Sequence, residues 1–394
     1  GVRGEERPRP VVIVLPGIMG SHLQVGSDRV WFDPLDIARG GLEKIAYRPE
    51  NLDKMNAEKL FEMFYGDLCE HLERTHRVVR YPYDWRRPVQ HAAEGLAREL
   101  RAALAATAAA RLPVRILAHS MGGLVTRAMA AAEHDLWKDF LARDGSRFVM
   151  LGTPNQGSHL MVEMLLGKGD TLRKLAMLDT RHSFQQVLDL VAGFRGGLQL
   201  LPRPGFRDGG THIDDYLKPK VWDDFRAQVF DFWFGNGKVG VPLDAACTEA
   251  RSLWELPDLR TPRVPGDHPE KVIYVCGKAD NTACGITVTG GRVKMLGTPE
   301  GDGSVSWASG RIDGIGEAYL MDAAHGDLAD TEEHFESLVQ LLADGTTRRL
   351  PRGWPSAVAR GEAAPNTVVY DAGPATVPTD EEAGRSLLGA STRR

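Results

Sequence analysis

Apolar residues follow two patterns along this chain, short unbroken runs and stripes at helical spacing. The short runs are rich in β-branched side chains, which is typical of strands that are buried on both faces of a sheet. We therefore predict strands at Val11–Leu15, Val114–Ala118, Arg147–Leu151 and Val272–Cys276, with a shorter one around Val78–Val79.

Helical patterns lie between these runs. Apolar residues recur at helical spacing over Met55–Arg74, and Ala92–Ala110 is rich in alanine, a strong helix former. A further helix is expected directly after Ser120. Strands that alternate with helices predict an α/β fold around a parallel sheet, whose strand carboxyl ends meet at one edge, where functional sites gather.

The alternation stops between Ser158 and Pro269, a stretch too long for one crossover. It contains helical patterns at Leu160–Leu166, Leu172–Leu178 and Phe184–Val191. An aromatic cluster follows, made of Trp222, Phe225, Phe230, Phe232, Trp233 and Phe234. We expect a mainly helical cap over residues 158–269, inserted into a core of residues 11–157 and 270–349, with a polar leader (1–10) and a flexible tail (350–394).

The segment AHSMGG, residues 118–123, joins a predicted strand to a predicted helix. A serine at such a corner lies on a strained turn with its hydroxyl above the sheet, and small neighbours such as Ala118 and Gly122 allow the turn to be sharp. The pattern favours Ser120 as a nucleophile, with the N–H of Met121 at the helix start as a donor to an oxyanion. A serine that only caps the helix is the alternative.

A serine nucleophile needs a base and an acid, which follow it in the order acid and then histidine in this type of site. Of the 12 histidines, His325 lies on a loop after a late strand-like run and is the expected base. Asp280 directly follows the run VIYVC, and Asp302 lies in the glycine-flanked turn GDGSV. Order and spacing fit both aspartates. The loop LPGIMGS after the first strand offers the N–H of Ile18 as a second oxyanion donor, or is a plain Pro-Gly turn.

Five motifs occur in a fixed order along residues 11–340. They are LPGIMGS (15–21), PYDWR (82–86), AHSMGG (118–123), LGTPNQGS (151–158) and GDGSV (301–305). Together they resemble the lecithin:cholesterol acyltransferase-like α/β hydrolases, which include many bacterial lipase-like proteins. Single motifs are weak signals, but the ordered set is specific.

This resemblance implies an α/β-hydrolase fold with a Ser-His-Asp triad that cleaves or transfers acyl groups of lipid-like carboxylic esters, without cofactor or metal. It favours Asp302 over Asp280 as the acid and places the oxyanion donors on Ile18 and Met121. It also implies that the segment after the LGTPNQGS motif forms a lid over an acyl groove. In PYDWR, we expect Asp84 and Arg86 to pair with each other and Trp85 to pack in the core.

Composition narrows the choice of partners. The formal net charge is −5 and the pI about 6.2, which argue against a nucleic-acid partner. Cys69, Cys247, Cys276 and Cys284 match no zinc pattern. Cys276 and Cys284 are near enough in sequence to form a bridge, but free buried thiols are expected. No apolar run reaches the ~20 residues of a membrane span.

Several hypotheses remain open from the sequence. The apolar cap predicts either contact with a membrane surface or only an internal lid core. A chain without an initiating Met fits a mature secreted form, or a hydrolase-fold effector or signalling module of a larger cytoplasmic protein with partner-gated activity. Amidase activity or deacylation of glycolipid anchors is a further alternative, and the sequence leaves the exact ester, the acyl length, and water or alcohol as the acceptor unspecified.

Overall fold

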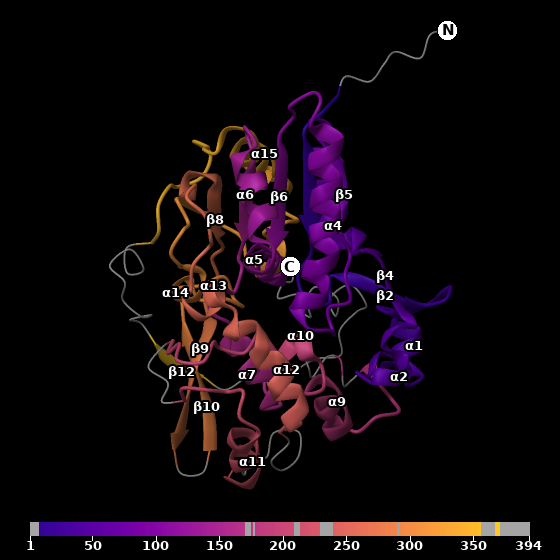
Figure 1. The fold of residues 1–394 in the computed structure, drawn as a ribbon. Coiled ribbons are helices and arrows are strands. Elements are labelled where there is room, and N and C mark those ends of the chain that lie inside the picture. The colour runs from indigo at the N-terminus through magenta and orange to yellow at the C-terminus, as the bar shows by residue number, and fades with distance from the viewer. Residues whose placement is uncertain are drawn as a thin grey trace.

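A parallel sheet forms the centre of the protein in a computed structural model, which describes residues 8–169, 175, 178–208, 213–228, 239–289, 292–355 and 367–370 (Figure 1). Its six strands have the order β11-β8-β7-β6-β1-β5, and every neighbouring pair is parallel. The strands are β1 (Val11–Leu15), β5 (Arg77–Arg80), β6 (Val114–His119), β7 (Arg147–Leu151), β8 (Val272–Cys276) and β11 (Glu317–Leu320).

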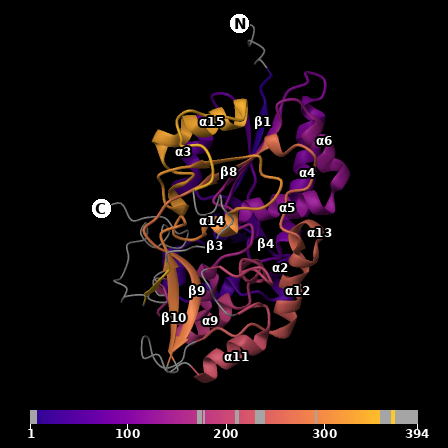
Figure 2. The same ribbon diagram turned by 90° about the vertical axis from the view of Figure 1, so that its left-hand side faces the viewer.

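Helices cover both faces of this sheet (Figure 2). One face carries α4 (Val89–Thr107), α5 (Met121–Ala132) and α6 (His134–Ala142), and the other carries α3 (Glu62–Leu72) and α15 (Phe335–Asp344). Every residue of β1, β6 and β8 is therefore buried, which explains their continuous apolar runs. The predicted α/β-hydrolase fold is confirmed.

The segment between β1 and β5 differs from the prediction. It forms a second, antiparallel sheet of β2 (Ser21–Val25), β3 (Asp28–Trp31) and β4 (Met55–Leu60), with the short helices α1 (Pro34–Ala38), η1 (Gly41–Ile45) and α2 (Pro49–Leu52). The prediction of one helix over Met55–Arg74 is wrong in its first part, because Met55–Leu60 pairs with β2 and the helix begins only at Glu62. A tertiary partner here overrides the local helical spacing.

Helices dominate the chain between β7 and β8, in the lower half of Figure 1. They are α7 (His159–Leu165), α9 (Phe184–Val191), α10 (Arg195–Leu198), α11 (Pro219–Gln228), α12 (Asp244–Glu255), α13 (Pro257–Arg260) and η2 (Pro269–Lys271). The helical patterns expected near α7 and α9 are present, whereas most of Leu172–Leu178 lies outside the described residues. Trp222 and Phe225 are buried within this layer, and Phe230, Phe232, Trp233 and Phe234 also lie outside the described residues.

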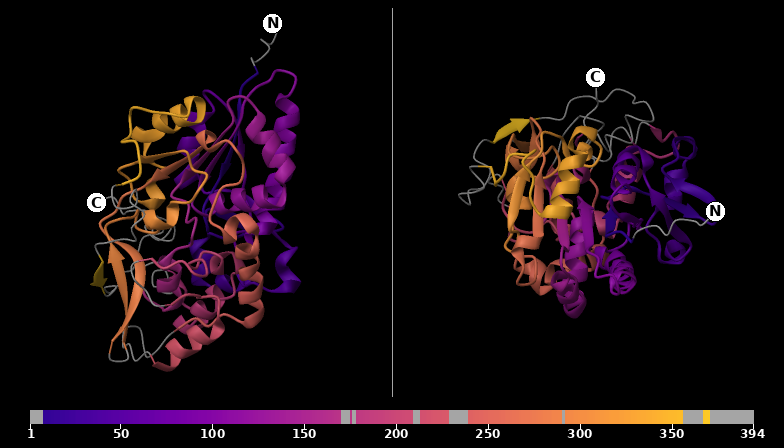
Figure 3. Two further views of the ribbon diagram at one scale, coloured as in Figure 1. Left: turned by 60° about the vertical axis from the view of Figure 1, so that its left-hand side comes forward. Right: turned by 90° about the horizontal axis from the view of Figure 1, so that it is seen from above.

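A hairpin of β9 (Thr282–Thr289) and β10 (Arg292–Thr298), with β12 (Val368–Tyr370) paired to β10, joins this lower layer (Figures 1 and 3). The hydroxyl of Tyr370 donates a hydrogen bond to Glu163 of α7. The layer thus includes residues after the predicted cap, and the cap limits at 158 and 269 stay a prediction. Residues 1–7 of the predicted leader and most of the predicted tail lie outside the described residues.

None of the described helices combines the length and the apolar character that crossing a membrane requires. The four cysteines are buried and free, as expected for Cys276 and Cys284.

Helix α5 approaches the end of β1 so closely that no side chain fits between them. A Cβ atom on Gly122 would lie 2.8 Å from the Cβ of Leu15 and 2.8 Å from the carbonyl oxygen of Pro16. A Cβ atom on Gly66, inside α3, would instead meet the carboxylate end of Glu62, a flexible side chain that can move aside. The two helical glycines therefore have different roles.

We predict that Gly122→Ala lowers the free energy of unfolding by about 1–3 kcal/mol, because the added methyl group overpacks the contact with β1. The matched variant Gly66→Ala should raise it by about 0.5–1 kcal/mol, because alanine favours the helix. Urea unfolding measures both changes. Equal stability of the two variants would contradict this account.

Candidate active site

Ser120 sits at the junction between β6 and α5 with an unusual backbone. Its φ of 53° and ψ of −123° lie where a residue with a side chain is rarely found. Its N–H donates to the carbonyl oxygen of Leu151 in β7 at 2.8 Å. A Cβ atom on Gly17 would lie only 3.0 Å from the Cβ of Ser120. Tight packing on two sides thus holds the strained corner in place.

His325 and Asp302 complete a chain of hydrogen bonds that begins at Ser120. His325 opens the short 3₁₀ helix η3 (His325–Asp327) after β11, and its Nε2 lies 2.8 Å from the Oγ of Ser120. Its Nδ1 lies 2.7 Å from Oδ2 of Asp302, and its backbone N–H donates to the carbonyl oxygen of Asp302 at 2.8 Å. All three side chains are buried.

The GDGSV turn shapes the carboxylate of Asp302 for this contact. Its Oδ1 accepts the N–H groups of Ser304 at 3.0 Å and Val305 at 2.7 Å, so Oδ2 is left to face His325. Asp280 is exposed on a separate groove, and no hydrogen bond joins it to His325 within the described part of the chain. The structure therefore brings Asp302, and not Asp280, against the histidine.

Gly152 of the LGTPNQGS motif makes room for this pair. A Cβ atom there would lie 2.6 Å from Oδ2 of Asp302 and 3.0 Å from Nδ1 of His325, and Gly152 has a positive φ of 58°. Only glycine meets both conditions without strain. The motif is thus explained by the space that the Asp302–His325 pair occupies.

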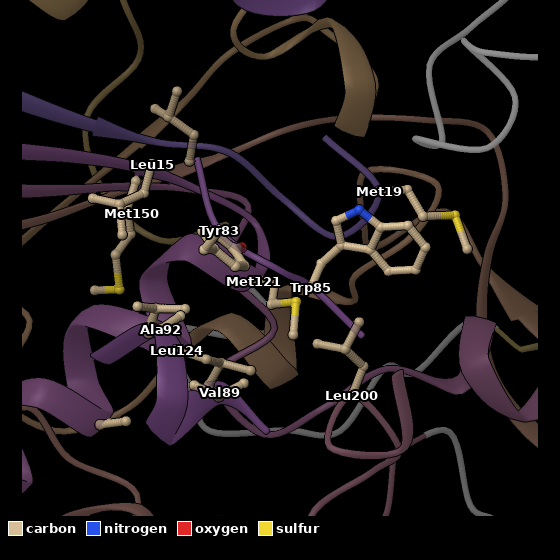
Figure 4. Close-up of a cluster of buried hydrophobic side chains, with 14 of the residues drawn as sticks. Leu15, Met19, Tyr83, Trp85, Val89, Ala92, Met121, Leu124, Met150 and Leu200 are labelled. Atoms are coloured by element: carbon tan, nitrogen blue, oxygen red, sulfur yellow. The ribbon is translucent and has the colours of Figure 1, made fainter. Parts of the chain in front are cut away.

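Four aromatic side chains hold the backbone of the LPGIMGS loop. Three donate to its carbonyl oxygens, and the fourth accepts one of its N–H groups. The bonds are Tyr83 Oη to Pro16 O (2.7 Å), Trp31 Nε1 to Met19 O (3.1 Å), Trp85 Nε1 to Ser21 O (3.2 Å) and Gly17 N to Tyr65 Oη (2.9 Å). Figure 4 shows Met19, Tyr83, Trp85 and Met121 in one buried cluster. The loop is therefore rigidly placed beside Ser120.

The N–H groups of Ile18 and Met121 have no hydrogen-bond partner among the described residues. Met121 is the first residue of α5, where N–H groups lack an intrahelical acceptor and the helix dipole is positive. Both residues belong to segments that pack directly on Ser120, because Gly17 contacts its side chain and Met121 follows it. They are available to bind an anion that forms next to the serine.

Asp84 and Arg86 of the PYDWR motif form a two-pronged pair. Nε of Arg86 lies 2.9 Å from Oδ1 of Asp84, and Nη2 lies 2.7 Å from Oδ2. Arg86 also donates to the carbonyl oxygen of Ile45 at 3.1 Å. Together with the fully buried Trp85, these contacts have the structural role expected for this motif.

An apolar pocket opens at Ser120 and His325. Within the described part of the chain, no Lys, Arg, Asp or Glu side chain lines it. The segment between β7 and β8 contributes Leu160, Met161, Met164, Val191, Phe194 and Leu200 to it. Among the described lining residues, the polar side chains besides the two histidines and Ser120 are those of Ser158 and Ser304.

No group of three or more His, Cys, Asp or Glu side chains could hold a metal ion in the described part of the structure. Two residues near the site were not expected from the sequence. Tyr65 bonds to the loop at Gly17, and His119 lies between Tyr65 and the backbone of His325. Tyr65 belongs to none of the five motifs, whereas His119 lies within AHSMGG, in which a role was expected only for its neighbours.

Comparisons with known proteins indicate a family for part of the chain. The family model of lecithin:cholesterol acyltransferase matches residues 38–209, so the resemblance inferred from the motifs is confirmed over that segment. The match also confirms the predicted class, a lipid ester hydrolase or acyltransferase. No curated protein sequence matches significantly.

Solved structures with a similar fold include a Bacillus licheniformis lipase in mature form, with 13% identity over 87% of this chain and 96% of that one and a TM-score of 0.36. A soluble variant of a Saccharomyces cerevisiae monoglyceride lipase has 13% identity over 87% of this chain and 89% of that one, with a TM-score of 0.37. Legionella pneumophila phospholipase PlaB has 14% identity over 77% of this chain and 45% of that one, with a TM-score of 0.35. At such low identity and TM-score, these likenesses say nothing about substrate.

Four buried histidines among the described residues stay uncharged at neutral pH. Burial lowers the pKa of His119 and His159 to about 3, and the pKa of His22 and His76 to about 4. In the unfolded chain the same groups take up a proton near pH 6.5. Below that pH the unfolded state binds more protons than the folded state, so the stability is complete above pH 6.5 and falls as the pH falls.

We predict that the free energy of unfolding decreases by about 1.4 kcal/mol per pH unit below pH 6.5 for each of these histidines. His159→Phe should reduce this slope by one such increment, because phenylalanine binds no proton in the unfolded state. The replacement should be tolerated, because neither ring nitrogen of His159 has a hydrogen-bond partner in the described structure. Denaturant unfolding between pH 7 and pH 5 measures the slope. The exposed His268 provides the control variant His268→Gln, and an equal effect of both variants would refute the assignment.

Proposed function

Because residues 38–209 match the lecithin:cholesterol acyltransferase family, we propose that this chain is a serine hydrolase that cleaves or transfers acyl groups of lipid-like carboxylic esters. The observation that carries the proposal is the hydrogen-bonded chain from Ser120 through His325 to Asp302, with contacts of 2.8 and 2.7 Å. Such a chain is the arrangement that activates a serine hydroxyl for attack on a carbonyl carbon.

In the first half of the reaction, Nε2 of His325 takes the proton of the Ser120 hydroxyl as Oγ attacks the ester carbonyl carbon. Asp302 accepts the Nδ1–H of His325, which fixes the tautomer and stabilises the imidazolium that forms. The carbonyl oxygen becomes an oxyanion and receives hydrogen bonds from the N–H groups of Ile18 and Met121. When the tetrahedral intermediate collapses, His325 gives its proton to the leaving alkoxide and an acyl-Ser120 ester remains.

In the second half, water or an acceptor alcohol attacks the acyl-Ser120 ester. His325 takes a proton from this nucleophile and returns it to Oγ of Ser120 as the acyl group leaves. The products are a carboxylic acid when water is the acceptor and a new ester when an alcohol is. The protein's own residues supply every group that these steps need.

The apolar pocket supports an acyl chain as the part of the substrate that is buried. Among the described residues, its lining has no lysine or arginine to balance the charge of a phosphate or carboxylate, so we expect a charged headgroup to remain outside it. Since helices α7 and α9 supply much of the lining, we propose that residues 158–269 form the lid of this acyl site. Contact of the lid with a membrane surface stays a prediction from the sequence.

Replacement of the two candidate acids separates them. Asp302→Asn should lower kcat on a p-nitrophenyl ester by on the order of 10⁴-fold, because the amide disfavours the required histidine tautomer. Asp280→Asn should stay within about twofold of wild type. A fluorophosphonate probe should label wild type and Asp280→Asn, and should not label Ser120→Ala. Labelling of Ser120→Ala to the wild-type extent would overturn the proposal.

The acyl pocket predicts a change of chain-length preference when it is filled. Met164→Trp adds bulk among the lining residues and should lower kcat/KM for long-chain p-nitrophenyl esters by about tenfold or more, with little effect on the acetate. Leu243→Trp, at an exposed position outside the pocket, is the control. A parallel panel of amides and phospholipids tests the amidase and deacylase alternatives. An unchanged chain-length profile would contradict the assignment of the pocket.

A further inference from the structure

Tyr65 and His119 form a buried connection between two parts of the site that are far apart in sequence. Nε2 of His119 lies 2.8 Å from the carbonyl oxygen of His325, and Nδ1 lies 2.7 Å from the hydroxyl of Tyr65. The same hydroxyl lies 2.9 Å from the N–H of Gly17, the residue before Ile18. One continuous chain of hydrogen bonds therefore runs from the LPGIMGS loop to the backbone of the proposed base.

The direction of every hydrogen bond in this chain follows from chemistry. A carbonyl oxygen can only accept, so Nε2 of His119 carries the proton that it donates to His325. Burial lowers the pKa of His119 to about 3, so its ring is neutral and Nδ1 is an acceptor. Burial also raises the pKa of the Tyr65 phenol, which keeps the proton that Tyr65 donates to Nδ1. The free lone pairs of the Tyr65 oxygen then accept the N–H of Gly17.

The two ends of this chain carry the groups that must be placed accurately for the reaction. At one end, His119 and the carbonyl oxygen of Asp302 hold the backbone oxygen and N–H of His325. At the other end, the N–H of Gly17 is anchored beside the N–H of Ile18, the proposed oxyanion donor. His119 is also adjacent in sequence to Ser120. The nucleophile, the base and the oxyanion loop are thus tied to a single pair of side chains.

We propose that Tyr65 and His119 are positioning residues that hold His325 and the Ile18 N–H in one geometry relative to Ser120, an inference that rests on the proposed function. Loss of the Tyr65 hydroxyl leaves the buried N–H of Gly17 and Nδ1 of His119 without partners, and both ends of the chain can then shift. A displacement of about 1 Å at a reacting group can cost on the order of a hundredfold in rate.

The test compares Tyr65→Phe, His119→Phe and the double variant with wild type on p-nitrophenyl octanoate, with rates expressed per active site titrated by a fluorophosphonate. Each single variant should lower kcat about tenfold to a hundredfold and change KM by less than about twofold. The double variant should be no slower than the slower single variant, because the two residues act as one unit. His119→Gln, which keeps a donor toward His325, should recover part of the loss.

Tyr319→Phe is the matched control, because Tyr319 is equally buried and donates one hydrogen bond, to Thr346, away from the site. It should keep kcat and KM. A Tyr65→Phe variant with wild-type kcat per titrated site, while Ser120→Ala is inactive, overturns this inference and leaves the proposed function intact. Losses that multiply in the double variant overturn it as well. An active Ser120→Ala overturns the proposed function instead. If His119→Phe does not fold, the comparison of Tyr65→Phe with Tyr319→Phe decides alone.

Discussion

The close approach of backbone segments around Ser120 is the constraint on which the rest of the site depends. Gly17, Gly122 and Gly152 each stand where a Cβ atom would collide with Ser120, with the end of β1, or with the Asp302–His325 pair. Because these positions lack side chains, the first loop, the helix after the serine and the end of β7 converge on one residue. That convergence in turn holds Ser120 in its strained conformation.

Burial strengthens the hydrogen bonds of the site. The hydrogen-bonded chain of Ser120, His325 and Asp302 lies at a pocket whose described lining carries no Lys, Arg, Asp or Glu side chain, and hydrogen bonds are stronger where water is excluded. The carboxylate of Asp302 is stabilised by two N–H groups of its own turn. The N–H groups of Ile18 and Met121 are also held in place near Ser120. Aromatic side chains hold the loop that carries Ile18, and Met121 is the first residue of α5. In the proposed mechanism, these N–H groups are already in place for the negative charge that develops on the substrate oxygen.

The sequence predicted the parts of the structure that depend on local patterns. Arg147–Leu151 and Val272–Cys276 were predicted with their observed limits, because strands buried on both faces leave unbroken apolar runs. The strand Met55–Leu60 was missed because its partner residues in β2 lie 30 to 39 positions earlier in the chain and its own spacing also suits a helix. Order and spacing left Asp280 and Asp302 open, and only the family resemblance favoured Asp302, because the folded path of the chain decides which aspartate meets His325. Tyr65 could not be found, because its contacts join three separate segments and follow no sequence pattern.

The central claim is that Ser120 carries the acyl group during turnover. Acid quenching of the enzyme during the reaction with p-nitrophenyl octanoate, followed by peptide mass spectrometry, tests it directly. The account predicts an octanoyl adduct on the peptide that contains Ser120, with fragment ions that place it on the serine. An octanoyl adduct on another residue would contradict the role of Ser120 as the acyl carrier. Turnover by Ser120→Ala at the wild-type rate would contradict it as well.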